Sequence, residues 1–284
     1  MIRLALACCV NLLLAAHALS AAAIAAGPAL PRPAHVVIVV EENKNFADVI
    51  GNQDAPFINQ IAQQGALFTR SYGVAHPSQP NYFALFAGVK NRNRDGCPAT
   101  GVDPWSANLA SELAAKRLSF AGYSETLPAA GFSGCFYGRE PAAYARKHNA
   151  WVHFQNVPAS ANLPFSALPA YAALPTVAFI VPNEEHDMHS APVAQGDDWL
   201  RSNIGPLLRW ARGHNTLVII TWDEGRSFFS NHIPTLIAGP MVRPGRYGTR
   251  IDHYALLRTV EDFYGLPYAG NSSQVAPIVD CWQH

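Results

Sequence analysis

The stretch HVVIVVEEN, residues 35–43, decides the fold. Its five consecutive apolar, β-branched residues show no alternation with polar ones, which predicts a strand buried on both faces of a parallel sheet. The run stops at Glu41, Glu42 and Asn43. Side chains able to bind a cation therefore follow directly on a buried strand.

Three similar apolar runs recur along the chain, at 176–182 (TVAFIVP), 216–222 (TLVIITW) and 233–240 (IPTLIAGP). Between the runs lie segments with helical spacing of apolar residues, at 56–65, 81–88, 106–117, 197–213 and 253–265. Strands that alternate with helices predict an α/β fold with a mostly parallel central sheet.

The chain has 284 residues, of which 49% are hydrophobic, and shows no repeat or break in composition. We therefore expect one domain over residues 27–284. A formal net charge of zero gives no electrostatic reason to expect a nucleic-acid scaffold as partner.

The first 26 residues, MIRLALACCVNLLLAAHALSAAAIAA, predict a signal peptide, because a basic start leads into an apolar run that ends in small residues. A membrane anchor is the alternative, but Asn11 and His17 interrupt the run. We expect a secreted or periplasmic protein without a stable membrane span after processing.

Three cysteines remain after such processing: Cys97, Cys135 and Cys281. In an oxidising compartment two of them can pair. The sequence favours Cys97 with Cys135, because both lie in turn-rich segments between the same two predicted core elements. Three free thiols are the alternative, and the spacing does not resemble a zinc site.

Polar side chains also follow the second and third apolar runs, and one precedes the fourth. In open α/β sheets the active site lies at the carboxyl ends of the strands, so these segments are expected to converge. Carboxylate oxygens and imidazoles together favour a divalent metal ion, although each segment alone is also typical of a solvated turn. The residues concerned are Asn183, Glu184, Glu185, His186, Asp187 and His189, then Asp223 and Glu224, and finally His232.

The stretch HPSQPNYFALFAG, residues 76–88, places Ser78 directly before a predicted apolar helix. One interpretation is that Ser78 only caps the helix through its hydroxyl. The other is that Ser78, at the positive end of the helix and next to a metal ion, is the nucleophile. The acidic strand ends favour the nucleophile.

The motifs resemble those of a known family. S-x-P-N-Y, with a Gly ten residues after the Ser, is similar to the nucleophile segment of the alkaline phosphatase superfamily. The whole set resembles the bacterial phosphoesterase family more closely, which contains secreted acid phosphatases, non-haemolytic phospholipases C and a phosphatidylinositol 3-phosphatase. It comprises EEN-x-x-F, HPSQPNY, YSETLP, YARKHN, PNEEHDMH, WDEG, NHIPTLIAGP and HYALLRTVEDFYGLP, from about residue 35 to about residue 270.

This resemblance implies an alkaline-phosphatase-like, three-layer α/β/α fold and a phosphoseryl intermediate on Ser78. It also implies one or two divalent metal ions of unknown identity. The first would be held by Glu42, Asn43, Asp223 and Glu224 beside Ser78.

The second ion would lie at the positions of Asn183, Asp187 and His232. Asn183 and Asp187 depart from the family's Asp and His. These departures leave the second ion open, and a single-metal site with His186 or His189 as general acid is equally compatible. The side chains expected at the substrate are those of His76, Asn81, His148 and Asn183.

We therefore expect a metal-dependent hydrolase of phosphoric esters, first of all an acid phosphatase acting on phosphomonoesters. The substrate is small and phosphorylated, with phospholipids and phosphoinositides among the candidates. One alternative is a phosphodiesterase of the phospholipase C type. Another, from a different class, is a non-catalytic envelope protein that binds a ligand. A metal-free serine hydrolase lacks support, because the chain has no G-x-S-x-G motif.

Overall fold

A central sheet of eight strands, in the order β12-β2-β11-β9-β1-β8-β4-β7, organises the structure. The structure is a computed structural model and describes residues 30–226 and 229–283, so the predicted signal peptide lies outside the described residues. The strands of this sheet are β1 His35–Glu41, β2 Ala66–Phe68, β4 Phe120–Ser124, β7 Asn162–Pro164, β8 Val177–Val181, β9 Thr216–Trp222, β11 Thr235–Ala238 and β12 Gly245–Tyr247.

Strand β1 lies near the middle of the sheet and pairs in parallel with β8 and β9. The sheet is mostly parallel, as predicted. Strand β11 is reversed, since it pairs antiparallel with both β9 and β2. The residues that precede β11 consequently lie at the same edge as the residues that follow β1, β8 and β9.

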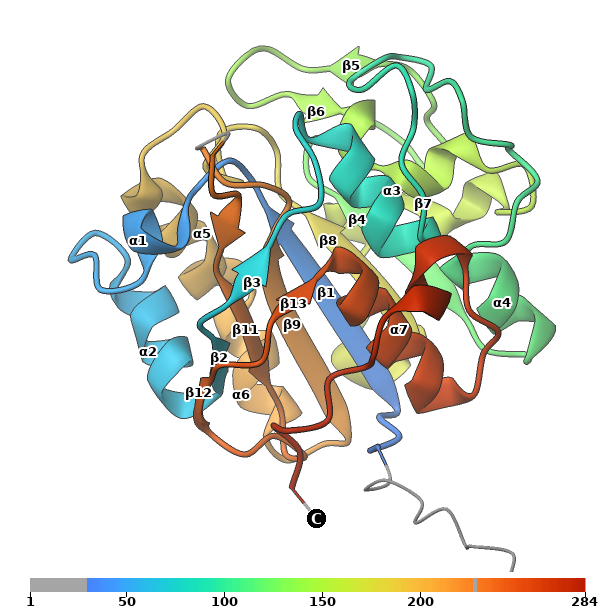
Figure 1. Ribbon diagram of the computed structural model, residues 1–284. Helices are drawn as coiled ribbons and strands as arrows, with labels where there is room; N and C mark the ends of the chain where they lie inside the picture. Colours follow the sequence, from blue (N-terminus) through green and yellow to red (C-terminus); the bar gives the residue numbers. More distant parts are fainter. Residues whose placement is uncertain (1–29, 227–228, 284) are drawn as a thin grey trace, which may run out of the picture.

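Helices cover both faces of the sheet (Figure 1). Successive β1 side chains alternate between the faces: Ile38 packs into a core with α3, α4 and α7, and Val39 into a core with α2, α5 and α6. Fully burying one such side chain stabilises the fold by about 1.5–3 kcal/mol. The predicted three-layer α/β/α fold is confirmed. The helices are α1 Phe46–Val49, α2 Pro56–Gln64, α3 Gln79–Ala87, α4 Leu109–Ala115, α5 Val193–Asn203, α6 Gly205–Ala211 and α7 His253–Tyr264.

The predicted helix 197–213 is two helices, α5 and α6, which meet at Ile204. Pro206, in the first turn of α6, has no N–H for the bond that would continue α5. Strand β4 was not predicted from composition, because its sequence FAGYS is short and contains a glycine.

Two small sheets lie outside the main one. The first has the order β10-β3-β13, and the second pairs β5 with β6. Their bounds are β3 Ser71–Tyr72, β5 Phe136–Tyr137, β6 Tyr144–Ala145, β10 His232–Ile233 and β13 Ile251–Asp252.

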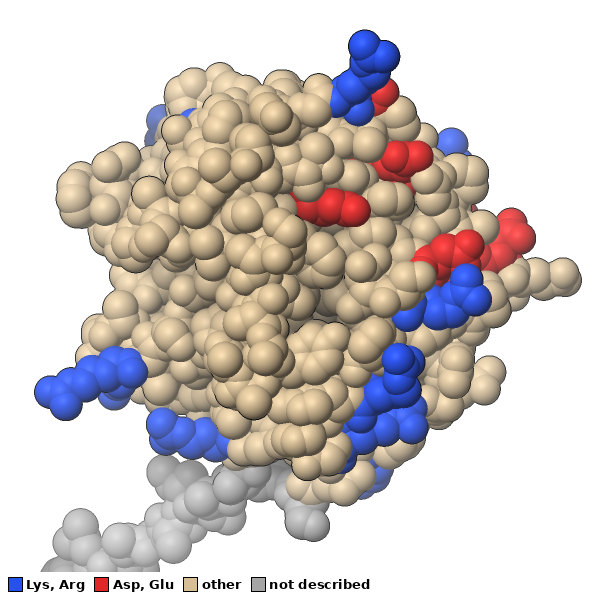
Figure 2. Space-filling model, turned by 180° about the vertical axis from the view of Figure 1, so that it is seen from behind, with Lys and Arg blue, Asp and Glu red and all other residues tan. Residues whose placement is uncertain are grey.

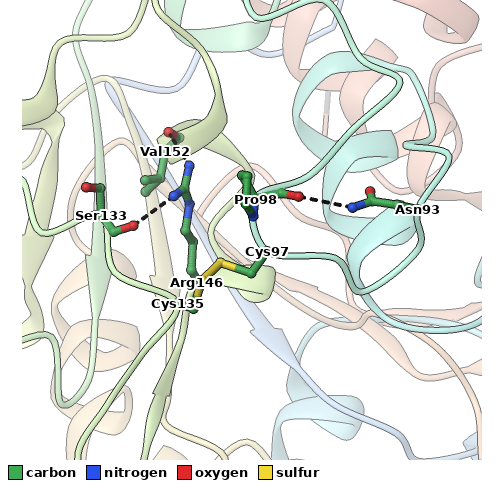
Figure 3. Close-up of a disulfide and its surroundings, with 7 residues drawn as sticks. All are labelled: Asn93, Cys97, Pro98, Ser133, Cys135, Arg146 and Val152. Carbon is green, nitrogen blue, oxygen red and sulfur yellow. Dashed lines mark hydrogen bonds between the residues drawn. A yellow bond between two sulfur atoms is a disulfide. The ribbon is translucent and has the colours of Figure 1, made fainter.

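The structure contains the favoured disulfide between Cys97 and Cys135, and Cys281 is a buried free thiol (Figure 3). The disulfide joins the loop after α3 to the segment before β5. Arg146 strengthens this junction by donating from its guanidinium to the carbonyl of Ser133 at 2.8 Å. Asp95 lies in the loop after α3 and Lys147 follows Arg146, so the disulfide and the bond from Arg146 to Ser133 together connect the segments in which these two residues meet.

The molecular face opposite to that of Figure 1 is largely uncharged (Figure 2). Its Lys and Arg side chains stand in separate groups, and acidic side chains adjoin some of them. No helix among the described residues is long and apolar enough to cross a membrane.

Candidate active site

The ends of three central strands converge, as the sequence predicts. The Glu42 N–H, just after β1, donates to the carbonyl of Asp187 in the loop after β8, at 2.7 Å. The Asp223 N–H, just after β9, donates to the carbonyl of Glu41 at 2.9 Å. The Asn43 N–H donates to the Asp223 carboxylate at 3.2 Å, which fixes that side chain beside β1.

Ser78 lies between two of these carboxylates. Its Oγ is 3.0 Å from Glu42 Oε2 and 3.3 Å from Glu224 Oε1, and the hydroxyl can donate its proton to either. Ser78 stands at the N-cap position of α3, yet its side chain makes no capping hydrogen bond. The capping interpretation is therefore wrong, and the hydroxyl instead faces the carboxylates.

Helix α3 fixes the position of Ser78. All nine of its residues are buried, and Gly88 ends it in the left-handed conformation, with φ of 67°. A Cβ at Gly88 would lie 1.9 Å from the carbonyl oxygen of Ala269, so no larger residue fits there. Helix α3, which carries Ser78 at its N-terminal end, is therefore part of the core and has little freedom to move.

Asn81 holds the loop that leads into Ser78. Its Oδ1 accepts from the N–H groups of Val74 at 2.9 Å and Ala75 at 3.0 Å, and its Nδ2 donates to the carbonyl of Ala75 at 3.0 Å. These contacts occupy the amide and favour a structural role over the expected contact with a phosphate. His76, also expected at the substrate, contacts the Glu224 carboxyl group through its Nδ1.

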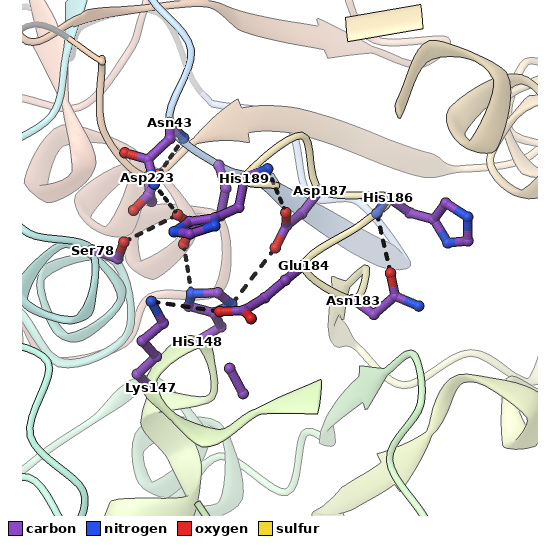
Figure 4. Close-up of polar contacts among 12 residues, drawn as sticks. Asn43, Ser78, Lys147, His148, Asn183, Glu184, His186, Asp187, His189 and Asp223 are labelled. Atoms are coloured by element: carbon purple, nitrogen blue, oxygen red, sulfur yellow. Dashed lines mark hydrogen bonds and ion pairs between the residues drawn. The ribbon is translucent and has the colours of Figure 1, made fainter. Parts of the chain in front are cut away.

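His148, which the sequence analysis expects at the substrate, is buried within the carboxylate cluster. It is 1% exposed, with Nε2 2.9 Å from Glu42 Oε1 and Nδ1 3.7 Å from Asp187 Oδ2. Its ring stacks on Tyr82 at a centroid distance of 5.1 Å, and the Tyr82 hydroxyl donates to Glu42 Oε1 at 3.0 Å. Figure 4 shows His148 beside Lys147 and below Ser78 and Asp187. His148 thus orients Glu42, the carboxylate that also accepts from Ser78.

Lys147 brings a positive charge to the same group. Its ammonium lies 3.4 Å from Asp95 Oδ2 and 3.6 Å from Glu184 Oε1. Burial opposes its charge, but the carboxylates of Glu42, Asp95 and Glu184 together raise the pKa of Lys147. It is therefore a permanent cation beside the cluster.

The buried carboxylates differ in charge. Burial alone would raise the pKa of Glu42, but His148 and Lys147 outweigh it and lower the pKa to about 2. Burial and the Glu42 charge together raise the pKa of Asp187 and of Asp223, and raise that of Glu224 to about 8. Glu42 thus keeps its charge, while its neighbours retain their protons unless a further cation enters.

A divalent cation fits this group in its donor chemistry. Asp187 Oδ2 and Asp223 Oδ2 are buried oxygens without a hydrogen-bond partner among the described residues. Oxygen donors of this kind suit a hard cation, which would also offset their mutual repulsion. In the described part of the chain, however, no three His, Cys, Asp or Glu side chains are grouped as a metal site. The carboxylates are held instead by Ser78, Asn43 and His148.

The loop after β8 separates the two histidines that were expected as alternative acids. His186 Nδ1 lies 2.9 Å from Glu125, and Figure 4 shows its ring pointing away from Ser78. The His189 N–H donates to Asp187 Oδ1 at 2.8 Å, and burial lowers the pKa of its imidazole. His189 lies on the Ser78 side of the loop (Figure 4).

Two other expected residues make contacts that stabilise loops. Asn183 Oδ1 accepts from the N–H groups of Glu185 and His186 at 3.1 Å, which shapes the turn after β8. His232 stacks between Phe46 and Tyr72 at 4.7 and 5.1 Å, and its Nε2 lies 3.0 Å from the carbonyl oxygen of Thr69. The contacts of His232 therefore favour packing over the expected metal ligation. Asn43 fits its expectation better, since its Nδ2 donates to Glu42 Oε2 at 2.9 Å.

Sequence reasoning missed Tyr82 and Asp95, and it named Glu41 only as part of the polar strand end. Tyr82 follows Ser78 by four residues, the spacing that places two helical side chains on one face, so helical periodicity was a usable signal. Nothing in the sequence joins Asp95 to Lys147. Glu41 is fully buried, and burial raises its pKa well above the usual range. It lies next to Glu42 in the chain but on the opposite face of β1.

Comparisons with known proteins show the family of this chain. The model of the phosphoesterase family matches residues 51–267, a span that includes Ser78 and begins after Glu42. The chain belongs to the phosphoesterase family. It is 46% identical over 261 residues to the phosphatidylinositol-3-phosphatase of Mycobacterium tuberculosis, which covers 90% of this chain and 85% of that protein.

More distant relatives extend the comparison. The acid phosphatase of Aspergillus fumigatus is 32% identical over 260 residues, or 84% of this chain, but the chain spans only 56% of that enzyme's length. The structure of an alkaline phosphatase superfamily protein from Vibrio parahaemolyticus aligns with a TM-score of 0.60 at 12% identity, over 89% of this chain and 72% of that one. The family resemblance is confirmed, and the protein is a hydrolase of phosphoric esters.

Proposed function

We propose that this phosphoesterase is a secreted, metal-dependent phosphatase that hydrolyses phosphomonoesters through a phosphoseryl intermediate on Ser78. The observation that supports it best is the hydroxyl of Ser78 at 3.0 Å from the buried carboxylate of Glu42. A serine that gives its hydrogen bond to an ionised acid, and not to its helix, has a base within reach.

The chain's own residues provide most of the chemistry. Glu42 accepts the proton of Ser78 as Oγ attacks phosphorus, and the bond from phosphorus to the alcohol oxygen breaks. His189, on the Ser78 side of its loop, gives a proton to that leaving oxygen when its imidazole is protonated, which its lowered pKa confines to acidic pH. A water molecule then attacks the phosphoserine, phosphate leaves, and Ser78 Oγ takes a proton back. Lys147 stands beside the cluster as a cation for the phosphoryl oxygens.

A divalent ion would be held by Glu42, Asp223 and Glu224, with Asp187 and Asn43 beside it. Bound there, it would supply the positive charge that stabilises a deprotonated Ser78 and the phosphoryl oxygens. The partnerless oxygen of Asp223 and the raised pKa of Glu224 support a cation at this place.

The class of substrate is inferred from the names of the relatives and not from a contact in the site. The mycobacterial relative carries the name phosphatidylinositol-3-phosphatase and the fungal one acid phosphatase, so both are named for phosphatase activity. We therefore place phosphomonoesters first, with phosphoinositides among them. A phospholipase C-type diesterase is the second candidate, because the same cluster accepts a diester if the second substituent fits. The predicted signal peptide and the disulfide support secretion.

The test compares an aryl phosphate, an alkyl phosphate and a phosphodiester, using the wild type, Ser78→Ala and Ser71→Ala. Ser71 is the matched control, a buried serine that bonds Thr235 away from the cluster. Ser78→Ala should lose about a thousandfold in kcat, as is typical when a nucleophile is removed, and Ser71→Ala should keep its activity. Acid quenching should trap a phosphoenzyme in the wild type but not in Ser78→Ala.

Three outcomes would reject parts of the proposal. Near-normal activity of Ser78→Ala would show that another group attacks phosphorus. Full activity after rigorous metal removal, verified by metal analysis, would reject metal dependence. Dominant turnover of the diester would exchange the first candidate substrate for the second.

A further inference from the structure

A polar pocket of 670 Å³ opens beside the carboxylate cluster, and the sequence analysis assigned no function to it. Its walls include Lys44, His189 and Arg226. These residues follow Glu42, Asp187 and Glu224, each by two positions, in the three loops that build the cluster. The loops that carry the carboxylates therefore also shape the pocket, and His189 belongs to both.

The pocket has an excess of positive charge. Lys44 and Arg226 face it, together with one acid, Asp48. The Asp48 carboxylate accepts from the N–H and the side-chain amide of Asn45, at 2.9 and 2.8 Å, so it is engaged in the turn before α1. The Lys44 ammonium donates to the carbonyl of Met188, which holds the cation against the wall beside His189.

Lys44 and Arg226 line the same pocket, and the Asp48 carboxylate there is already engaged by Asn45. Two like charges held together in this way are relieved by an anion. A guanidinium presents a planar fork that matches two phosphate oxygens, whereas an ammonium acts as a point charge. Lys44 and Arg226 together therefore suit a phosphate-type anion.

We propose that this pocket binds a second phosphate-type group, on the alcohol side of the substrate, through Arg226 and Lys44. This inference rests on the proposed function, because it takes Ser78 as the point of attack and His189 as the donor to the leaving oxygen. His189 lines the pocket. The alcohol that leaves beside His189 therefore lies at the entrance of this pocket. A leaving group with its own anion would meet Arg226 and Lys44 there.

The second anion can be a free phosphate or a lipid phosphodiester, and three soluble substrates distinguish them. Inositol 3-phosphate carries no second anion, inositol 1,3-bisphosphate carries a free phosphate, and short-chain phosphatidylinositol 3-phosphate carries a phosphodiester. For the wild type, kcat/KM should be at least about tenfold higher for one of the last two than for the first, the effect of one good charge-assisted contact. The substrate that gains identifies the source.

Arg226→Gln should reduce this preference about tenfold, mainly through KM. Arg212→Gln is the matched control: Arg212 lines a different pocket, shared with Gly239 just after β11, at the opposite edge of the sheet. It should keep the wild-type ratio. Lys44→Gln should act in the same direction as Arg226→Gln, and thermal unfolding checks that each variant is folded.

Equal kcat/KM for all three substrates in the wild type, or an unchanged ratio in Arg226→Gln, would overturn the inference. Either result would leave the Ser78 mechanism intact, provided that Ser78→Ala is inactive on all three. Activity of Ser78→Ala would instead reject the proposed function on which this inference rests.

Discussion

Two groups of buried carboxylates lie on the side of the sheet that α3, α4 and α7 cover, and they differ in what surrounds them. One is the cluster around Glu42 and Ser78. The other is the pair of Glu112 in α4 and Glu261 in α7, two helices that pack against each other. Burial and the neighbouring acid raise the pKa of Glu112 to about 8, and burial raises that of Glu261 to about 7.

The comparison shows what turns buried acids into a site. Glu261 is satisfied locally by the N–H of Ala269 at 2.8 Å and the hydroxyl of Ser272 at 2.6 Å, and the pair relieves its repulsion by holding protons. In the cluster, His148 and Lys147 keep Glu42 ionised, so that it accepts the hydrogen bond of Ser78 and keeps a charge that can hold a cation. Repulsion between buried acids alone therefore does not identify a catalytic centre.

Replacing one carboxyl group in each cluster by its amide should give the largest difference in activity between the two groups. We expect Asp223→Asn to lose at least about a hundredfold in kcat/KM, because the cluster loses an oxygen ligand and a charge that would hold a cation. The matched change Glu112→Gln should leave kcat/KM unchanged. Assays with an aryl phosphate, together with metal analysis of both variants, provide the measurement.

A smaller effect on Asp223→Asn, with metal content preserved, would mean that this carboxylate is structural like Glu112. The two groups would then differ less than their surroundings indicate.

The loop after β8 offers a second contrast, between His189 and His186. His189→Ala should reduce kcat on an alkyl phosphate about a hundredfold, the effect typical of a general acid. On an aryl phosphate, whose leaving group needs less help from a proton, the loss should be much smaller. His186→Ala should stay within about threefold of the wild type on both, because its ring bonds Glu125 and points away from Ser78. The reverse ranking would move the general acid to His186.

These residues also show where sequence reasoning stops. Strands β1, β8 and β9 were predictable because burial on both faces requires continuous apolar runs, and the topology then brings their polar ends together. His186 and His189 could not be separated, because they are three residues apart in a loop without periodicity. Met188, between them, is buried with φ of 76°, and that local turn sets the direction of His189.

His148 illustrates a second limit. Its motif, YARKHN, led to an expected contact with the substrate, yet the fold places it against Glu42 and Asp187. No local pattern encodes the contact with Glu42, because it joins segments more than a hundred residues apart along the chain. The disulfide was easier, since Cys97 and Cys135 lie between the same two predicted core elements.

The structural pair should be visible in stability rather than in activity. A folded-state pKa of about 8 for Glu112, above its usual 4.5, means that the fold favours the protonated acid. Its contribution is fully present below about pH 4.5 and is lost as the pH rises towards 8. Glu112→Gln should therefore unfold less readily than the wild type at pH 8.5, by about 1–2 kcal/mol after allowance for solvent screening.

Urea unfolding at pH 5 and pH 8.5 measures this difference, with the exposed Asp54→Asn as control. Equal stabilisation of Glu112→Gln at both pH values would show that Glu112 does not titrate in this range.

The smallest expected effect on activity is that of replacing His232. This variant tests whether His232 belongs to the site or only packs beside it. Its ring stacks on Phe46 and Tyr72, so His232→Gln should cost about 1 kcal/mol of stability through lost stacking. Activity should remain within about threefold, and metal affinity should not change, because the contacts of His232 are with aromatic rings and a carbonyl. A tenfold loss of metal affinity, measured by titration into the metal-free protein, would instead make it a ligand. The cluster would then extend to the start of β11, and its difference from the Glu112 pair would include a second cation position.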